Sequence, residues 1–179
     1  KFQSPLKLHQ TEIVFSQFKK TINKYRGSKH MQEAAEEVLY VMRELPKLFL
    51  PHDLPQRAIH GDPKISNIVF DNKYKAKAII DLDTCSRNTV LVELGDAFRS
   101  WCGREEDDPN NTFRLSIFRS GWGGYWKEAQ TFLLQKERRL VPKAIGMITL
   151  ELASRFLRDY FEDNYFGWDP SRYESRRDH

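Results

Sequence analysis

Apolar residues recur at steps of three and four positions in four stretches of the chain. In residues 8–25 and 28–45 they mark one face of an amphipathic helix. The third stretch runs from Leu91 to about Cys102, and residues 143–166 form the most apolar of the four. This pattern predicts a mostly α-helical protein whose longest helix lies in the core.

Turn-forming residues limit these helices. Gly27 ends the first, Ser28 begins the second, and Pro46 permits its end nearby. The glycine-rich residues 121–124 lack the Lys-Ser/Thr ending of a phosphate-binding loop. They therefore predict a bend between two helices.

Between the second and third helical stretches the pattern changes to short apolar runs. Residues 68–70 and 78–80 are such runs, and the turn signal at residues 71–73 separates them. If they pair as antiparallel strands in which the numbers of two paired residues add up to about 148, Asn67 lies opposite Asp81. The chain is therefore predicted to have an α+β, mostly helical fold with one small β-hairpin.

Composition indicates a folded protein without a membrane-spanning segment. A length of 179 residues fits one domain, and 40% hydrophobic and 13% aromatic residues exclude a disordered chain. Basic and acidic residues number 29 and 25, which argues against a nucleic-acid partner. No run of 18 apolar residues and no signal peptide is evident, so we expect no membrane partner.

Two cysteines and the first residue add to this picture. Cys85 and Cys102 are the only cysteines and fit no CxxC or zinc spacing, so we expect a reduced protein in the cytoplasm. Cys85 is either a small apolar filler or, because it lies near two acids, a reactive thiol. A chain that starts with Lys1 instead of Met is expected to be part of a longer one.

The chemistry concentrates in a loop before the first strand and in the segment after the second. Asp62 can accept a proton, Lys64 can neutralise phosphate charge, and Asn67 offers a neutral metal ligand. Asp81 and Asp83 add two carboxylates for a hard cation. Each residue alone has a plainer reading as a turn, loop or strand-end residue. Together they supply what phosphoryl transfer from a metal nucleotide requires.

Four further residues accompany this set. His60 is interpreted as a brace of the loop, through hydrogen bonds. Asp96 either supports the loop from a helix or is an acid near a helix start. Arg57 and Arg99 either contact a substrate hydroxyl or phosphate or form structural ion pairs.

These motifs resemble a known enzyme superfamily. His60-Gly61-Asp62-x-Lys64-x-x-Asn67 is similar to the catalytic loop of the aminoglycoside phosphotransferase and choline kinase superfamily, which has a protein-kinase-like fold. Ile80-Asp81-x-Asp83 is similar to the metal-binding strand end of that superfamily, and Leu94-Gly95-Asp96 follows in order. Residues 54–99 also resemble the N-acetylhexosamine 1-kinases, although Gly61 and residues 86–88 depart from that pattern.

The resemblance implies an ATP- and Mg²⁺-dependent small-molecule kinase. Asp62 would be the catalytic base, and Lys64 would assist catalysis and contact the cofactor phosphates. Asn67 and Asp81 would bind the cofactor through Mg²⁺, with Asp83 as a further metal or substrate contact. The acceptor would be a hydroxyl of a small molecule, a sugar such as an N-acetylhexosamine or an amino alcohol.

The resemblance also implies that residues 1–179 form only the C-terminal lobe. No glycine-rich loop after a strand and no strand lysine of a nucleotide lobe is evident, so the N-terminal lobe of the same full-length protein is an expected partner. We therefore expect the fragment to bind Mg-nucleotide weakly and to turn over little by itself.

Three alternatives remain open at this point. The chain could be an aminoglycoside- or choline-type kinase, or a kinase-like binding or scaffold domain without catalysis. The Asp81-Leu82-Asp83 run also matches the DxD metal site of glycosyltransferases, although that reading leaves residues 60–67 unexplained.

Overall fold

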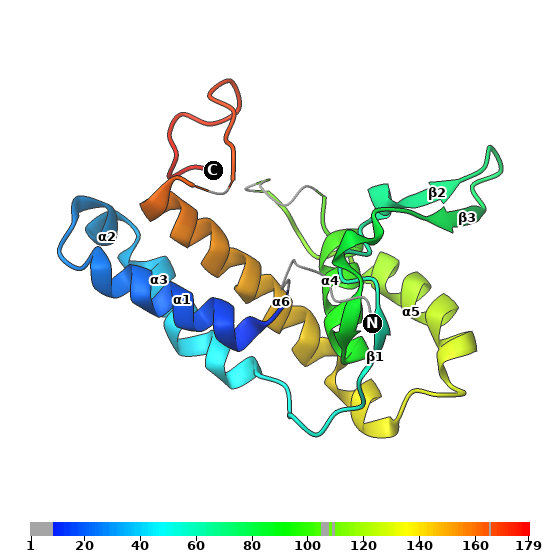
Figure 1. Cartoon of the computed structure of the whole chain (residues 1–179). Coiled ribbons are helices and arrows are strands. Elements are labelled where there is room, and N and C mark those ends of the chain that lie inside the picture. Colours follow the sequence, from blue (N-terminus) through cyan, green and yellow to red (C-terminus); the bar gives the residue numbers. More distant parts are fainter. Residues whose placement is uncertain (1–8, 105–107, 109, 165) are drawn as a thin grey trace. The chain divides into compact units, whose positions relative to one another are not determined.

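The computed structural model describes residues 9–104, 108, 110–164 and 166–179. The chain divides into two compact units, both drawn in Figure 1. Of the described residues, unit 1 comprises His9 and those in Leu50–Thr149, and unit 2 comprises those in Gln10–Phe49 and Leu150–His179.

The described elements are mostly helical, as predicted, which is compatible with a kinase-like C-terminal lobe. The α-helices are α1 (Thr11–Lys24), α2 (Lys29–Glu33), α3 (Ala35–Glu44), α4 (Val90–Cys102), α5 (Leu115–Ala129) and α6 (Gln135–Glu162). The 3-10 helices are η1 (Leu45–Leu48), η2 (Ile65–Asn67) and η3 (Leu82–Thr84). The strands are β1 (Arg57–Ile59), β2 (Ile68–Phe70), β3 (Ala76–Ile79) and β4 (Ser86–Asn88).

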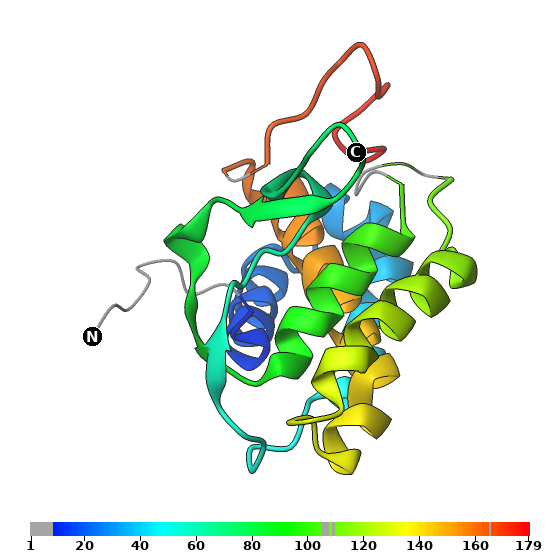
Figure 2. The same cartoon turned by 90° about the vertical axis from the view of Figure 1, so that its right-hand side faces the viewer.

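Two antiparallel strand pairs flank the loop of residues 60–67 in unit 1. The hairpin β2–β3, predicted from the sequence, is present, and β1 pairs with β4. The pairing of β1 with β4 was not predicted, because Ser86-Arg87-Asn88 carries no apolar alternation. Figure 2 shows unit 1 with the hairpin turned toward the viewer.

The predicted register of the hairpin is wrong by one residue at Ile68 and by two at Phe70. Ile68 pairs with Ile79 instead of Ile80, and Phe70 pairs with Ala76. The pairing shifts between Val69 and Phe70. The turn imposes one alignment on the strand ends beside it, the other ends pair in a different alignment, and a bulge accommodates the difference. Asn67 consequently lies opposite Ile80, whose N–H donates to the Asn67 carbonyl at 2.9 Å.

The apolar core of unit 1 forms mainly around α4. Buried side chains from α4, from the end of α5 and from the first half of α6 meet there. Its fully or almost fully buried members are Leu54, Val90, Leu91, Leu94, Phe98, Cys102, Ala129, Leu133, Val141 and Ala144. This core fixes α4, the helix that packs behind the loop of residues 60–67.

The glycine-rich residues 121–124 lie inside α5, so the predicted bend is wrong. Phe118 and Trp122 stack on this helix and pack against Phe98 of α4, and a side chain at Gly121 would come within 3.1 Å of the Phe98 ring. The close aromatic packing offsets the low helix propensity of glycine, roughly 1 kcal/mol per residue.

Helix α6 begins earlier than predicted and includes Pro142. Proline in a helix interior costs roughly 3 kcal/mol and was expected to precede the helix. Val141 and Ala144, on either side of it, are buried in the unit 1 core, which holds this turn in place. The helix then continues into unit 2.

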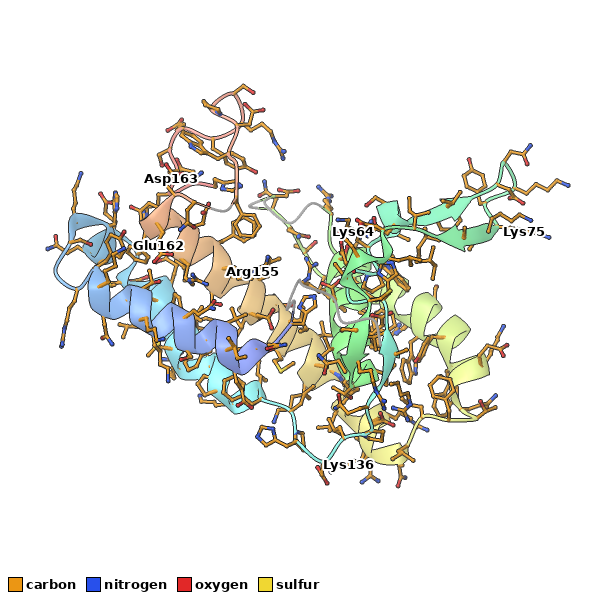
Figure 3. The ribbon with its side chains drawn as sticks, viewed as in Figure 1. Lys64, Lys75, Lys136, Arg155, Glu162 and Asp163 are labelled. Carbon is orange, nitrogen blue, oxygen red and sulfur yellow. The ribbon has the colours of Figure 1, made fainter. Side chains whose placement is uncertain are left out.

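Unit 2 packs α1 and α3 with the second half of α6. The Thr11 hydroxyl donates to the buried Glu151, and the Thr21 hydroxyl donates to Glu162 at 2.9 Å. Arg155, Glu162 and Asp163 mark the last turns and end of α6 in Figure 3. The apolar core of the unit consists of Phe15, Phe18, Ala34, Val38, Val41, Leu45, Phe161 and Tyr173.

The helices predicted in unit 2 are present with altered limits. Helix α1 starts at Thr11, and residue 8 of the predicted range lies outside the described residues. Ser28 caps the second helix by accepting the N–H of Met31, but Ala34 interrupts that helix and divides it into α2 and α3. Within the described part of the chain, no helix is both long and apolar enough to cross a membrane.

Candidate functional site

The loop at residues 60–67 brings three of the predicted residues together. The side-chain amide nitrogen of Asn67, which is buried, donates to the backbone oxygen of Asp62 at 2.9 Å and to its Oδ2 at 3.2 Å. Lys64 Nζ lies 2.9 Å from the same Oδ2. The Asp62 side chain keeps 21% of its surface exposed, so its carboxylate is both anchored and reachable.

His60 braces this loop in the geometry. Its Nδ1 accepts the backbone N–H of Asp62 at 3.2 Å, so Nε2 carries the proton and donates to the Ile80 carbonyl at 2.9 Å. The backbone oxygen of His60 accepts the Thr84 hydroxyl at 2.8 Å. Through His60, the loop is tied to the end of β3 and to η3.

Gly61 occupies a position that admits no side chain without rearrangement. Its φ of +87° lies in the left-handed region that favours glycine. A Cβ there would stand 2.7 Å from the Thr84 carbonyl oxygen. The close approach of η3 to the loop therefore depends on glycine next to Asp62.

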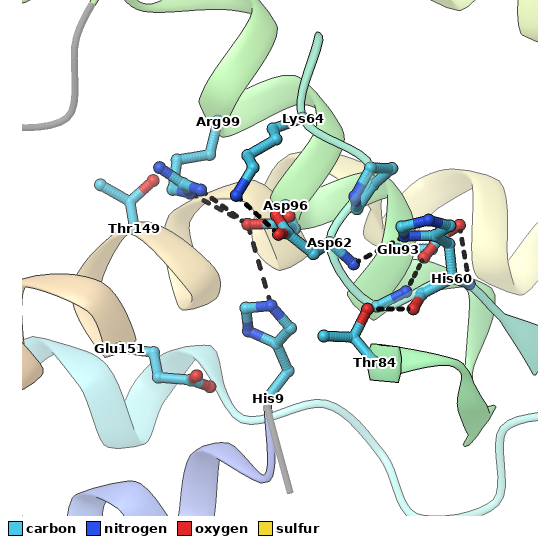
Figure 4. Close-up of polar contacts among 12 residues, drawn as sticks. His9, His60, Asp62, Lys64, Thr84, Glu93, Asp96, Arg99, Thr149 and Glu151 are labelled. Atoms are coloured by element: carbon cyan, nitrogen blue, oxygen red, sulfur yellow. Dashed lines mark hydrogen bonds and ion pairs between the residues drawn. The ribbon is translucent and has the colours of Figure 1, made fainter. Parts of the chain in front are cut away.

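Glu93 of α4 holds the loop from behind and was missed in the sequence. Its two carboxylate oxygens accept the backbone N–H groups of His60 at 3.1 Å and Gly61 at 2.8 Å. Figure 4 shows this contact together with those of His60 and Thr84. An acid in a helix that follows the loop by about thirty residues was the available signal, but nothing local distinguishes it from a surface acid.

Asp96 lies deeper in α4 and is almost fully buried. Arg99 Nη2 donates to Asp96 Oδ1 at 2.7 Å, and His9 Nε2 lies 3.8 Å from that oxygen. A second link joins α4 to the loop, because the Trp101 indole N–H donates to the Pro63 carbonyl at 2.7 Å. Figure 4 shows the Asp96–Arg99 pair and the Asp62–Lys64 pair.

Arg57 is held by a buried acid. Its guanidinium pairs with Glu137, which has no exposed surface, and donates to the Phe132 carbonyl at 3.1 Å. Hydrogen bonding to Glu137 raises the pKa of Arg57, against the lowering effect of burial. These contacts support the ion-pair alternative for Arg57.

Asp81 and Asp83 lie on the exposed turn that follows β3. Asp81 adopts a left-handed conformation with φ of 68°, and η3 begins directly after it. This conformation ends the strand, so strand alternation no longer fixes the direction of the Asp81 side chain. Asp81 lies one position beyond Ile80, the residue opposite Asn67.

One comparison with known proteins decides the family. The family model described as APH, phosphotransferase enzyme family, matches residues 14–125, which is more than half of the chain. The chain belongs to the phosphotransferase enzyme family. The match includes the loop around Asp62 and the turn with Asp81 and Asp83.

Asn67, Asp81 and Asp83 of this phosphotransferase carry amide and carboxylate oxygen atoms, the kind of ligand that Mg²⁺ prefers. Among the described residues, no three His, Cys, Asp or Glu side chains gather as a metal site. Mg²⁺ usually binds through one or two carboxylates together with water and substrate phosphates, so such a cluster is not required. The amide oxygen of Asn67 and the carboxylates of Asp81 and Asp83 are of the chemical type that such a site uses.

Cys85, beside the turn that follows β3, lacks the lowered thiol pKa of a reactive cysteine. Burial raises the pKa of its thiol, and the nearby carboxylates of Glu93 and Asp83 raise it further. A raised pKa disfavours the nucleophilic thiolate. This agrees with the interpretation of Cys85 as a small filler.

Proposed function

We propose that this phosphotransferase is a small-molecule kinase that transfers the γ-phosphoryl group of ATP to a hydroxyl. The observation that carries the proposal is the environment of the Asp62 carboxylate. Asn67 anchors it, Lys64 lies 2.9 Å from it, and part of its surface remains exposed. In this family context, such a carboxylate is a suitable partner for an acceptor hydroxyl.

Asp62 is the proposed catalytic base. Its carboxylate would orient the acceptor hydroxyl and take its proton as the oxygen bonds to phosphorus. Lys64 neutralises Asp62 in the described state, and its longer, more exposed side chain would turn to the phosphate oxygens when nucleotide binds. His60, Gly61 and Glu93 would keep the loop backbone in place during this exchange.

The metal-binding residues in this proposal are Asn67, Asp81 and Asp83. Bound Mg-nucleotide would supply the phosphoryl group and the positive charge that offsets the charge on its oxygens. The amide nitrogen of Asn67 donates to Asp62, which leaves the amide oxygen as the metal-binding atom. Asp81 and Asp83 have exposed side chains on a turn that a solvated ion can reach.

We further propose that an N-terminal lobe of the full-length protein covers the hairpin side of unit 1. A two-stranded hairpin alone has little stability, and large apolar side chains gathered on a surface mark an interaction site. The large apolar residues of the hairpin and its neighbouring turns each expose at least 41% of their surface. They are Ile65, Val69, Phe70, Tyr74, Ile79, Ile80 and Leu82. A nucleotide base and a second lobe would bury this surface.

For the acceptor, we propose a sugar hydroxyl, with an N-acetylhexosamine as the first candidate. The support is the sequence pattern of residues 54–99. The Arg99 guanidinium, paired with Asp96, is the arginine of α4 that would position such a substrate.

The test uses the full-length protein with ATP, Mg²⁺ and a panel of hexosamines, aminoglycosides, choline and homoserine. ADP release that depends on one acceptor is expected, and chelation of Mg²⁺ should abolish it. Asp62→Asn should lower kcat about 10²–10⁴-fold, the range for loss of a general base. Asp53→Asn is the matched control, because Asp53 pairs with Lys136 on the surface.

Two outcomes would reject the proposal. One is the absence of acceptor-dependent ADP release across the panel, which would favour a kinase-like scaffold. The other is an Asp62→Asn variant as active as the Asp53→Asn control. A preference for choline or an aminoglycoside would retain the kinase but replace the sugar.

A further inference from the structure

Unit 2 contains a cavity that the proposed kinase chemistry does not use. It has a volume of about 580 Å³, within the range of roughly 300–1,000 Å³ of small-molecule sites. It lies among α3, the second half of α6 and the segment that ends at His179. All of its lining residues belong to unit 2.

The walls of the cavity are mainly apolar. Two helices supply aliphatic and aromatic side chains, which suit a ligand with an apolar body. They are Ala34, Val41, Leu150, Ala153, Phe156 and Leu157. Such a wall gains free energy by covering a hydrocarbon body, at about 25 cal/mol per Å² of apolar area buried.

The most buried charges of the lining are already engaged in the fold. Arg176 donates to the buried Asp159 at 3.0 Å and to the Phe166 carbonyl at 3.1 Å. Asp159 also accepts the backbone N–H groups of Asn164 and Phe166, both at 3.0 Å. These contacts fasten the C-terminal segment to α6 and use the Arg176–Asp159 pair structurally.

Tyr160 also lines the cavity, and a hydrogen bond holds its side chain in place. Its hydroxyl donates to Glu33 at 2.6 Å, and burial together with this hydrogen bond raises the pKa of Tyr160 to about 12. The hydroxyl therefore stays protonated and bound at neutral pH.

Arg177 is the more weakly attached of the two arginines that line the cavity. Half of its side chain is exposed, and its Nη2 lies 3.5 Å from Glu37, beyond the usual hydrogen-bond range of roughly 2.7–3.2 Å. Glu36 and Glu37, the acids of the lining at this end, lie in the first turn of α3, where the helix N-terminus already stabilises them. Arg177 could therefore pair with a bound anion instead of Glu37 with little loss of folding stability.

We propose that the unit 2 cavity binds a small amphipathic anion, whose apolar body lies between α3 and α6 and whose carboxylate or phosphate pairs with Arg177. A guanidinium presents paired donors that match both head groups. This site is independent of the kinase proposal and would exist in a protein without catalysis.

Four probes with the same ten-carbon body test the proposal by titration calorimetry on the full-length protein, below their micelle concentrations. Decanoate and decyl phosphate should bind, and their ranking separates a carboxylate from a phosphate ligand. Decanol should bind at least about tenfold more weakly, the scale of a charge-assisted hydrogen bond. Decyltrimethylammonium should bind no better than decanol.

Three variants locate the site. Ala153→Trp fills the cavity and should abolish binding of both anions, with folding checked by circular dichroism. Arg177→Gln should weaken the anions about tenfold and leave decanol unchanged. Ile79→Thr is the control for adsorption to the exposed hairpin of unit 1, and it should bind as the wild type does.

Each contrary result overturns the proposal. These results are no anion binding, preference for the cationic probe, unchanged anion affinity in Arg177→Gln, or loss of binding in Ile79→Thr. If Ala153→Trp does not fold, Arg177→Gln decides the question, because Arg177 is half exposed and its replacement removes no core contact.

Discussion

The Glu93 carboxylate accepts the backbone N–H of Gly61 at 2.8 Å, one residue before the proposed catalytic base. The other Glu93 oxygen accepts the N–H of His60, so one helical side chain satisfies two successive loop amides. A carboxylate is suited to this task because both of its oxygens are acceptors.

Glu93→Gln should therefore damage both stability and catalysis. Glutamine keeps one acceptor and turns an N–H₂ group toward the other amide, which then lacks a partner. A buried donor without an acceptor costs about 1–3 kcal/mol, measurable by urea unfolding. In the full-length enzyme, kcat should fall more than KM changes, because the loop with Asp62 moves.

Glu128→Gln on α5 is the matched control, since Glu128 is exposed and should tolerate the change. If Glu93→Gln is as stable and active as this control, the bonds to the loop amides have no structural weight.

Gly61→Ala should be more harmful than Gly27→Ala, although both glycines have similar positive φ values, +87° and +84°. The left-handed backbone costs either alanine about 1–2 kcal/mol. At Gly27 nothing lies within 4 Å of an added Cβ, but at Gly61 the Thr84 carbonyl oxygen is 2.7 Å away.

The difference in unfolding free energy between the two variants isolates this clash, which we expect to add about 1–3 kcal/mol. Gly61→Ala should also lower kcat, because Asp62 follows directly. Equal losses of stability at the two positions would contradict the close approach of Thr84.

What the sequence predicted correctly is mostly local. Asp62, Lys64 and Asn67 lie within six residues, so their proximity could be predicted without a fold. The hairpin β2–β3 is likewise set by apolar runs and a turn between them. The helix limits at Ser28 and near Cys102 follow from capping and periodicity.

What could not be predicted depends on contacts between distant residues. Glu93 lies 32 residues from Gly61, and nothing in its neighbourhood in the sequence reveals the loop amides it accepts. The predicted hairpin register is off by one at Ile68 and by two beyond the bulge between Val69 and Phe70, and the apolar pattern does not reveal such a bulge. Gly121 remains helical because Phe98, 23 positions earlier, packs against it.

Arg57→Gln should behave as a stability variant and not as a substrate-binding variant. It would leave Glu137, which has no exposed surface, without its cation. Removing one partner of a buried ion pair costs roughly 3 kcal/mol or more, and the partial exposure of Arg57 places the expected loss at the lower end. Urea unfolding measures it, and KM for the acceptor should not change.

The pair can be tested as a unit. In Arg57→Gln/Glu137→Gln, the loss should be smaller than the sum of the single variants, since neither charge remains buried alone. Lys136→Gln, which breaks an exposed pair with Asp53, should have no measurable effect. A raised KM with unchanged stability in Arg57→Gln would instead identify a substrate contact.

The hairpin loop should loosen in acid because of Asp71. The backbone N–H groups of Lys75 and Lys73, both 2.9 Å from Asp71 Oδ1, lower the pKa of this carboxyl, and Lys77 at 3.2 Å lowers it further. A carboxyl with a lowered folded-state pKa stabilises the fold above its ordinary pKa of about 3.9. That contribution is lost as the pH falls through the folded-state value.

Amide hydrogen exchange of Lys73 and Lys75, corrected for intrinsic rates, should therefore report weaker protection at pH 3 than at pH 6. Asp71→Asn keeps an acceptor for both N–H groups but does not titrate, so its protection should not vary with pH in this range. Equal pH dependence in both proteins would assign the effect to another carboxyl. A loss confined to the wild type would show that the Asp71 carboxylate makes the order of this loop depend on pH.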